Sequence, residues 1–323
     1  MKAIIYSRYG APEKVLRFED VAKPAPKDDE VLVKVHAASI NEWDWSMVRA
    51  ATTFTRISGP FKPAHKILGA DVAGVVEAVG KSVTQFQVGD EVFGDLSQNG
   101  WGAYAEYVCT QENGLALKPE VLSFEQAASI PQGGVMALQG IRDYGKVGPG
   151  DKVLINGAGG AVGTFAIQIA KMFGAQVTAV DTTAKLEKLR VIGADHVIDF
   201  TAQDFTCTGQ RYDLIIEVGG FRSVFEHQRA LVQRGKCFFI GGSIPRILQT
   251  LFMGPIAGMA SGKKLGLLVQ KTNHDLAFFG DAMGADKVTP VIDRVFPLAE
   301  TAQAFRHYES GQFTGKIVIT VGP

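Results

Sequence analysis

The chain has 323 residues, 46% of them hydrophobic, so it is long enough for two domains and can bury a sizeable core. Its 33 Lys and Arg residues balance 33 Asp and Glu residues, which argues against a nucleic-acid partner. The N-terminal MKAIIYSRYG has no apolar run long enough for a secretory signal, which predicts a cytoplasmic protein. The apolar residues 247–260 fall short of the roughly 20 that a membrane span needs and are interpreted as a buried or subunit-facing wall. Cys109, Cys207 and Cys237 form no CxxC pair, which suits a reducing compartment.

Short strands and turns are predicted up to about residue 125. The segment EVLVKVHAAS alternates and is rich in valine, and DVAGVVEAVG, GDEVFG and GAYAEYVCT continue this pattern. The pattern changes after Leu122, where Ser123 is the expected N-cap of a helix with Gln126 in the capping-box position.

Apolar strands then alternate with helical segments. The expected strands are KVLIN, QVTAV, HVIDF, YDLIIEV, GKCFFIGG and KLGLLVQ. Such apolar runs, separated by helices, indicate parallel strands buried on both faces. From about Val288 we expect β structure again, through VTPVIDRVF, TAQAFRHYESG and GKIVITV. The predicted fold is therefore α/β: a doubly wound Rossmann domain over residues 125–287, and a β-rich domain from residues 1–124 and 288–323.

The stretch NGAGGAVG, residues 156–163, lies between the first of these strands and a helix. Ala158 is placed at the tight turn, Gly160 lets the backbone approach a pyrophosphate, and Gly163 lets the helix pack closely. Backbone N–H groups at the helix start, around Ala161 and Val162, then hold the phosphate charge with the helix dipole. The order strand, glycine turn and helix predicts a dinucleotide site.

Asp181 ends the next strand, 21 residues beyond Gly160. An acid at this place commonly bonds the ribose hydroxyls of a dinucleotide. The same residue also fits as the N-cap of the following helix, and the two interpretations are compatible.

These motifs resemble the medium-chain dehydrogenase/reductase superfamily, and more closely its zinc-free quinone oxidoreductase branch. The carriers of the resemblance run through nearly the whole chain in order: SINEWDW, LGADVAGVVEAVG, VGDEVFG, GAYAEYV, LSFEQAASIPQGGVMALQGI, GDKVLINGAGGAVGTFAIQIAK, LGLLVQKTNHDL, VIDRVFPLAETAQAF and GKIVITV. The resemblance implies a GroES-like, barrel-like catalytic domain beside the Rossmann domain, with the active site in the cleft between them. It usually implies a homodimer.

The resemblance also bears on metal binding. Zinc-dependent relatives have ligands at the positions of Asn41, Ala70 and Gln132. Alanine cannot ligate, and Asn and Gln are poor zinc ligands, so we expect no catalytic zinc. Without a Lewis acid, the expected reaction is hydride delivery from NAD(P)H to an electrophilic small molecule, a quinone or an α,β-unsaturated carbonyl.

Asn41 is the candidate catalytic residue. It occupies a family position that faces nicotinamide and substrate, and its amide donates without a change of charge. A structural role in closing a turn is equally compatible with the sequence. Trp43 and Trp45 are candidate walls of an acceptor site, or core residues.

The other expected cofactor contacts lie at the ends of the predicted strands, with two departures from the family. Met136 stands where many relatives have threonine, and Phe200 where many have tyrosine, so each loses a hydroxyl. The remaining candidates are Thr182, Thr183, Val218, Gly219, Gly220, Ile240, Gly241 and Gly242, with Ser243 beside them.

The choice between NADPH and NADH is left open by two residues. Asp181 repels a 2′-phosphate and favours NADH, whereas Lys185 matches a position that pairs with this phosphate in relatives that use NADPH. Lys185 also fits a solvated helix face. The family leans slightly to NADPH.

Two alternative functions remain compatible with the sequence. One is a zinc-independent alcohol dehydrogenase or carbonyl reductase on the same fold. The other is a non-catalytic NAD(P)-binding protein.

Overall fold

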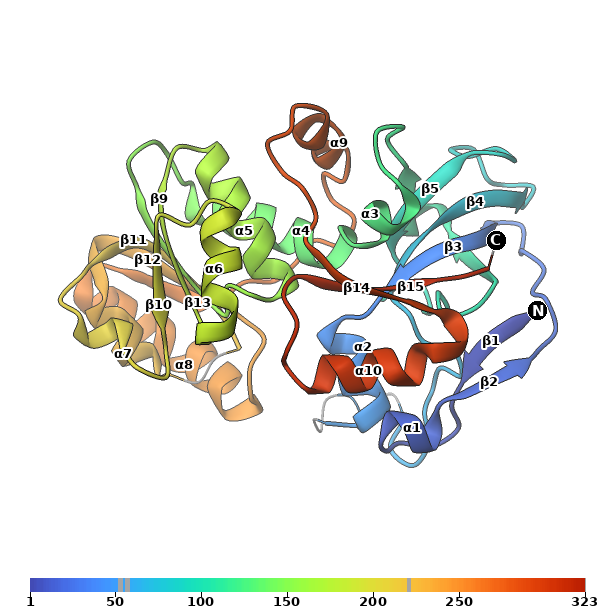
Figure 1. The fold of residues 1–323 in the computed structure, drawn as a ribbon, viewed down its shortest axis with the longest axis horizontal. Helices are drawn as coiled ribbons and strands as arrows, with labels where there is room; N and C mark the ends of the chain where they lie inside the picture. Colours follow the sequence, from blue (N-terminus) through green and yellow to red (C-terminus); the bar gives the residue numbers. More distant parts are fainter. Residues whose placement is uncertain (52–54, 56–58, 220–221, 323) are drawn as a thin grey trace. The chain divides into compact units, whose positions relative to one another are not determined.

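A computed structural model describes residues 1–51, 55, 59–219 and 222–322 (Figure 1). The chain forms two compact units. The first unit consists of Met1–Val135, Thr272–Ala285 and Ile292–Pro323, and the second of Met136–Lys271 and Asp286–Val291.

The second unit contains a parallel sheet of six strands among the described residues. Its strand order is β10-β9-β8-β11-β12-β13. The bounds are β8 (Lys152–Asn156), β9 (Gln176–Asp181), β10 (His196–Asp199), β11 (Tyr212–Val218), β12 (Leu231–Ile240) and β13 (Lys264–Leu267). The order reverses direction between β8 and β11, which is the place where doubly wound sheets bind ligands at the carboxyl ends of their strands.

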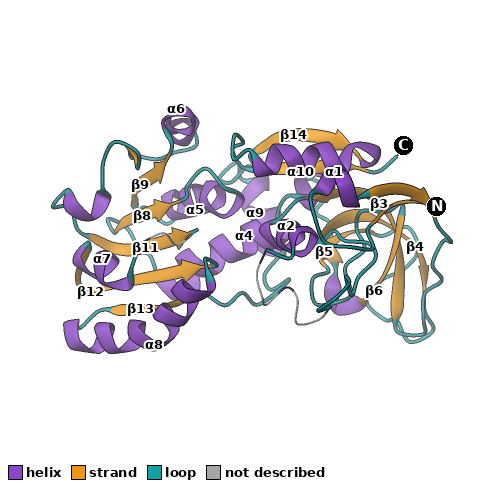
Figure 2. Cartoon of the chain, turned by 90° about the horizontal axis from the view of Figure 1, so that it is seen from below, coloured by secondary structure: helices purple, strands orange, loops and turns teal. Residues whose placement is uncertain are grey.

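Helices connect these strands, as Figure 2 shows for α5, α6, α7 and α8 around the sheet. The helical segments of this unit are the end of α4 (Pro131–Leu138), the π-helical η3 (Gln139–Gly145), α5 (Ala161–Met172), α6 (Thr183–Val191), the short η4 (Phe205–Cys207), α7 (Val224–Arg229) and α8 (Ile244–Ser261). The expected Rossmann-type alternation of strand and helix is confirmed.

Helix α8 has one side packed on β13 and one side in solvent. The packing on β13 is close: a Cβ at Gly254 would lie 2.9 Å from the backbone oxygen of Leu265. Its other face exposes large side chains, among them Leu251, Phe252, Ile256 and Met259. The expected wall is therefore buried on one side only. In the part of the chain that the structure describes, no helix is long and apolar enough to cross a membrane.

The first unit is built on a mostly antiparallel sheet. Its path runs β14-β15-β3-β4-β5-β7, with β6 paired to β3, and β1 and β2 form a separate pair. The strands are β1 (Lys2–Ile5), β2 (Arg17–Asp20), β3 (Glu30–Ser39), β4 (Asp71–Val79), β5 (Glu91–Asp95), β6 (Tyr107–Gln111), β7 (Ala116–Leu117), β14 (Ile292–Pro297) and β15 (Lys316–Thr320).

Short helices border this sheet. They are α1 (Pro12–Val15), α2 (Glu42–Arg49), η2 (Glu112–Gly114), α3 (Phe124–Ala128), the start of α4, α9 (Ala277–Gly284), η5 (Leu298–Glu300) and α10 (Thr301–Glu309). The capping box at the start of α3 is confirmed, since Ser123 Oγ accepts from Gln126 N–H at 3.2 Å and Gln126 Oε1 from Ser123 N–H at 3.0 Å.

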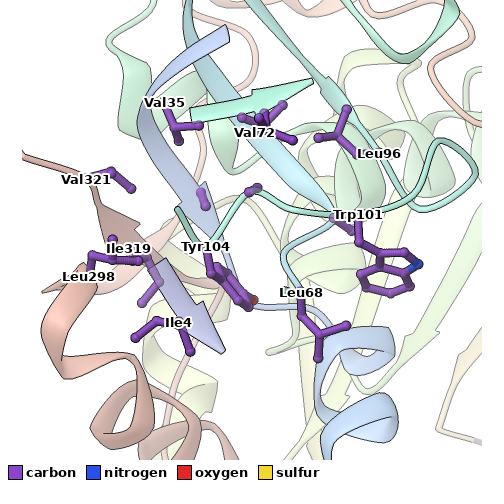
Figure 3. Packing of buried hydrophobic residues seen from close by; sticks show 14 of the residues in the cluster. Ile4, Val35, Leu68, Val72, Leu96, Trp101, Tyr104, Leu298, Ile319 and Val321 are labelled. Carbon is purple, nitrogen blue, oxygen red and sulfur yellow. The ribbon is translucent and has the colours of Figure 1, made fainter. Parts of the chain in front are cut away.

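A hydrophobic core fills the first unit. Figure 3 shows side chains from β1, β3, β4 and β15 packed together with Tyr104 and Trp101. The core joins segments from both ends of the chain, for example Ile4 and Ile319, which are both at most 3% exposed. Burial of this apolar surface is the main force that holds the N-terminal and C-terminal segments in one unit.

The units differ from the expected domains in three places, and the expected domain bounds stay a prediction. Residues 125–135 and 272–285 fall into the first unit, and residues 288–291 fall into the second. Hydrogen bonds join the first two segments to the sheet of the first unit. Gln132 N–H donates to Asp71 Oδ1 at 3.2 Å, and Asp95 N–H donates to Asn273 Oδ1 at 2.7 Å. The expected β structure over TAQAFRHYE is wrong. This segment is helix α10, because Thr301, Ala304 and Phe305 line one buried face at helical spacing.

Candidate functional site

The glycine turn of the second unit depends on close backbone contacts. Gly157 has a φ of +77°, and a Cβ there would lie 2.4 Å from the carbonyl oxygen of Val218. The N–H groups of Gly157 and Ala158 both donate to Val180 O, at 3.0 and 3.1 Å. The tight turn over residues 157–159 includes the expected Ala158. Its left-handed residue is Gly157, because only glycine tolerates this conformation and this approach.

Gly160 and Gly163 have the environments expected of them. A Cβ at Gly160 would meet only Gly157 O, at 3.5 Å, so the space beside this backbone is open. A Cβ at Gly163 would lie 2.5 Å from the backbone of Ala158, so α5 packs directly on the turn. Ala161 and Val162, both half-buried, form the first turn of α5, where N–H groups have no partner within the helix. This geometry fits a phosphate group.

Asp181 is joined to the same turn. Its Oδ2 accepts from Gly159 N–H at 2.7 Å, and its Oδ1 accepts from Thr182 N–H at 2.8 Å. The ammonium of Lys185 lies 3.4 Å from Oδ1. The N-cap position of α6 belongs to Thr182, so the carboxylate of Asp181 bonds the glycine turn rather than capping this helix.

The other expected cofactor residues lie at the carboxyl ends of neighbouring strands. Val218 and Ile240 are paired at the ends of β11 and β12. Gly219, Gly241 and Gly242 follow them with φ values of +108°, +68° and +109°. Gly220 lies outside the described residues, and Ser243 is the N-cap residue of α8. One edge of the sheet thus collects the turn, Asp181 and these strand ends.

Three expected residues lie at the margin of this edge. Phe200 follows β10, is 47% exposed, and donates its N–H to Asp181 O at 3.2 Å. Thr183 Oγ1 donates to Asp199 Oδ2. Met136 is half-buried on α4.

The buried acid Glu217 stabilises the residue that precedes the glycine turn. The sequence analysis did not identify this acid. The carboxylate of Glu217, fully buried, accepts from Asn156 Nδ2 at 2.8 and 2.9 Å. It also meets His227 Nε2 at 2.5 Å, while His227 Nδ1 donates to Ser223 O at 2.9 Å. Glu217 therefore holds the last residue of β8, directly before the glycine turn. The signal was an acid that follows the apolar run Leu214–Ile216 within the strand.

Asn41 lies in the first unit, immediately before α2. Its side chain is 5% exposed. Its Oδ1 accepts from the ammonium of Lys316, and its backbone N–H donates to Asp44 Oδ2 at 2.9 Å. The buried Nδ2 has no hydrogen-bond partner among the described residues. A buried donor without a partner is rare in native proteins and calls for an explanation, such as a ligand oxygen.

Lys316 joins Asn41 and Asp71 in one buried group, which we call the Asn41 cluster. The sequence analysis did not identify Lys316. It begins β15 and is 2% exposed. Its ammonium lies 2.9 Å from Asp71 Oδ2, an atom that also accepts from Ser39 Oγ at 3.1 Å. The other oxygen of Asp71 accepts from Gln132 N–H at 3.2 Å. The only sequence signal was a lysine at the start of an apolar strand.

Two more buried carboxyls lie near this cluster. Burial raises the pKa of Asp44 to about 7, and Asp71 and Asp95 add repulsion. Burial also raises the pKa of Asp95 to about 6, again with repulsion from Asp71. Donation from the N–H groups of Asn41 and Gly69 to Asp44 opposes this rise only in part. Burial therefore favours the protonated form of both carboxyls.

The two tryptophans of α2 differ. Trp45 Nε1 donates to Glu309 Oε1 at 2.9 Å, which ties α2 to α10, and its ring packs against the core. Trp45 is thus a structural residue in this unit. Trp43 is 40% exposed.

The residues at the family's metal positions do not suit zinc. Ala70 has no donor atom, and Asn41 Oδ1 already accepts from Lys316. In the described part of the chain, no three His, Cys, Asp or Glu side chains are grouped as metal ligands. The absence of catalytic zinc stays a prediction.

Three family models match parts of the chain between residues 27 and 319. Residues 27–120 match the family model described as an alcohol dehydrogenase GroES-like domain, residues 125–218 the model of the C-terminal domain of alanine dehydrogenase/PNT, and residues 192–319 the model described as a zinc-binding dehydrogenase.

Curated relatives match along their length. The 2-methylene-furan-3-one reductase of Solanum lycopersicum is 34% identical over 99% of this chain and 79% of its own. The chloroplastic quinone-oxidoreductase QR1 of Triphysaria versicolor is 31% identical over 99% of this chain and 98% of its own. The structure of the quinone oxidoreductase from Coxiella burnetii has a TM-score of 0.88 at 30% identity, and covers 100% of this chain and 99% of its own.

The chain belongs to the quinone oxidoreductase branch of the medium-chain dehydrogenase/reductase superfamily. The expected combination of a Rossmann-type domain with a GroES-like domain is confirmed. As a member of this superfamily the protein is an oxidoreductase. The open backbone at Gly160, the helix start after it and the strand ends beside it suit the NAD(P)H of such enzymes.

Proposed function

We propose that the protein is an NAD(P)H-dependent, zinc-independent oxidoreductase that delivers hydride to quinones or α,β-unsaturated carbonyls. The observation that carries this proposal is the buried Nδ2 of Asn41, a donor without a partner among the described residues. A carbonyl oxygen that gains negative charge during reduction is the kind of acceptor such a donor suits. The names of the relatives, a quinone oxidoreductase and a 2-methylene-furan-3-one reductase, support the same substrate class.

The proposed cofactor site consists of the glycine turn and the strand ends around it. Gly160 and the N–H groups of Ala161 and Val162 would hold the pyrophosphate, with Gly163 keeping α5 in place. Residues toward the adenosine would be Asp181, Thr182, Thr183, Lys185 and Phe200. Residues of the second unit toward the nicotinamide would be Met136, Val218, Gly219, Ile240, Gly241 and Gly242.

NADPH is the proposed cofactor form, by a small margin. The ammonium of Lys185 lies 3.4 Å from Asp181 Oδ1, so the positive charge offsets the acid that would repel a 2′-phosphate. A relative from Arabidopsis thaliana is named an NADPH-dependent alkenal/one oxidoreductase. Binding constants for NADPH and NADH decide the point, and tighter binding of NADH would reverse this assignment.

In this proposal the bound reduced nicotinamide supplies the hydride for the electrophilic carbon of the acceptor. Asn41 Nδ2 donates to the acceptor oxygen and stabilises the negative charge that develops there. Its amide stays neutral, so this role needs no proton transfer from Asn41. The proton that completes reduction comes from a donor outside this assignment.

Initial rates with three compounds test the proposal. The protein, treated with a chelator, is assayed with NADPH and benzylideneacetone, with NADPH and phenanthrenequinone, and with NADP⁺ and isopropanol. We expect turnover with the first two. Metal-free oxidation of isopropanol without reduction of the other two would favour an alcohol dehydrogenase, and tight NADPH binding without turnover would favour a non-catalytic protein.

A homodimer is the proposed assembly. The apolar side chains that α8 exposes, including Leu251, Phe252 and Ile256, support this proposal, because such a face is costly to leave in water. One chain has a mass of 34.7 kDa, and light scattering after gel filtration should give twice this value. A monomer at micromolar concentration would contradict it.

A further inference from the structure

Lys316 and Asp71 form a buried ion pair whose hydrogen-bonding groups are all used. The three N–H donors of the ammonium have three acceptors: Asp71 Oδ2 at 2.9 Å, Ile40 O at 3.4 Å and Asn41 Oδ1. The carboxylate accepts in addition from Ser39 Oγ and Gln132 N–H. Complete pairing of this kind is what a buried charge needs to be tolerated.

This pairing decides which way the amide of Asn41 faces. An ammonium can donate hydrogen bonds but cannot accept them, so the amide atom beside Lys316 has to be oxygen. The opposite rotamer would place an NH₂ group against a positive charge. Nδ2 is therefore turned away from Lys316, and it is the atom without a partner among the described residues.

We propose that Lys316 is a positioning residue that holds the amide of Asn41 with its NH₂ group toward the acceptor oxygen. This inference rests on the proposed function of Asn41. The ammonium also withdraws electron density through Oδ1, which makes the N–H groups of Nδ2 better donors. Asp71 supports this role of Lys316, because it holds the ammonium in place and neutralises its charge.

A mutant cycle distinguishes a positioning role of the Lys316–Asp71 pair from a purely structural role. The double variant Lys316→Met/Asp71→Asn removes both charges together, so that neither is left buried alone. We expect NADPH binding to stay within about twofold and kcat with benzylideneacetone to fall about tenfold, as Asn41 loses its orientation. In the Asn41→Ala background the same pair of changes should have no further effect on kcat. Additive losses would overturn the proposal.

A second variant leaves the ion pair intact. Asn41→Asp keeps an oxygen for Lys316 and replaces the NH₂ group by a second oxygen. It should lose as much kcat as Asn41→Ala. Retained kcat would mean that an oxygen of residue 41, not its NH₂ group, serves the reaction, and would overturn the proposal even if the double variant does not fold.

Lys118 offers a matched control. It is also buried, donates to Leu122 O at 2.5 Å and pairs with Glu91 at 2.8 Å. Lys118→Met should lower thermal stability and leave kcat within about twofold. A tenfold loss of kcat in this control would show that any buried lysine of this unit affects turnover, and would contradict a specific role for Lys316.

One readout separates failure of this inference from failure of the proposed function. Absence of turnover by the wild-type protein with both acceptors would refute the proposed function alone. The orientation of Asn41 is then read from the NMR signals of its side-chain NH₂ group, identified by their absence in Asn41→Ala. We expect one sharp set in the wild type and averaged or doubled signals in Lys316→Met/Asp71→Asn. The same sharp set in both would overturn the positioning role.

Discussion

The glycine turn of the second unit and the Asn41 cluster of the first unit prepare hydrogen-bond donors in opposite ways. At the turn, donors are backbone N–H groups, and the side chains are reduced so that a ligand can approach Gly160. Around Asn41, the donor is one side-chain amide held by a buried ion pair. The first arrangement depends on empty space, and the second depends on a filled network. Substitutions should therefore harm them by different means.

The largest effect is expected from adding one methyl group to the turn. Gly163→Ala places a Cβ 2.5 Å from the backbone of Ala158, so α5 has to shift. We expect the free energy of unfolding to fall by about 2 kcal/mol. NADPH binding, measured by fluorescence titration, should weaken more than about a hundredfold.

Gly160→Ala is the matched control, because its Cβ would meet only Gly157 O at 3.5 Å. Stability should change by less than about 0.5 kcal/mol. NADPH binding should still weaken, since the methyl group fills the space proposed for the pyrophosphate. Unchanged binding in Gly160→Ala would contradict the role given to the empty space.

The next effect concerns the filled network. Asn41→Ala should lower kcat with benzylideneacetone by about a hundredfold, the usual loss for one donor to a developing oxyanion. The Kd of NADPH should change much less, because the pyrophosphate contacts lie elsewhere. Steady-state rates and titrations check both. Turnover equal to that of the wild type would remove Asn41 from the mechanism.

A smaller effect is expected at the edge of the turn. Lys185→Ala removes the ammonium beside Asp181 and leaves the acid unneutralised. NADPH binding should weaken about tenfold while NADH binding stays within about twofold. Isothermal titration with both cofactors gives the comparison. If the variant binds NADPH and NADH with the same loss of affinity, Lys185 stabilises the turn and does not bind the 2′-phosphate.

The smallest effect is a pH dependence of stability from the first unit. Burial raises the pKa of Asp44 from 3.8 to about 7, and that of Asp95 to about 6. The folded state then binds protons more tightly than the unfolded state. This contribution is fully present below about pH 4 and is lost as the pH rises through these two values.

We therefore expect the melting temperature, followed by circular dichroism, to fall by a few degrees between about pH 5 and pH 8. Asp44→Asn should flatten this dependence, because the amide does not titrate. A melting temperature that rises over the same interval would show that other groups dominate.

The same contrast explains what could be predicted from the sequence. The glycine turn, the strands and the start of α3 are determined by residues close together in the sequence, so they could be predicted from it. The requirement for glycine at position 157 was missed, because it depends on the approach of Val218 from another strand.

The Asn41 cluster was harder to predict from the sequence. Lys316 and Asp71 meet Asn41 only because β15, β3 and β4 are neighbours in one sheet. A lysine at the start of an apolar strand carries no sign of such a partner. Asn41 itself was found through the family resemblance, and its unpartnered Nδ2 became visible only in the structure.

The position of the transferred hydrogen tests the central proposal most directly. The protein is incubated with benzylideneacetone and NADPH that carries deuterium at the reactive carbon of its nicotinamide, and the product is analysed by mass spectrometry and NMR. Our account predicts a saturated ketone with one deuterium on the carbon β to the carbonyl. Deuterium on the carbonyl carbon of an unsaturated alcohol would contradict it and identify a carbonyl reductase.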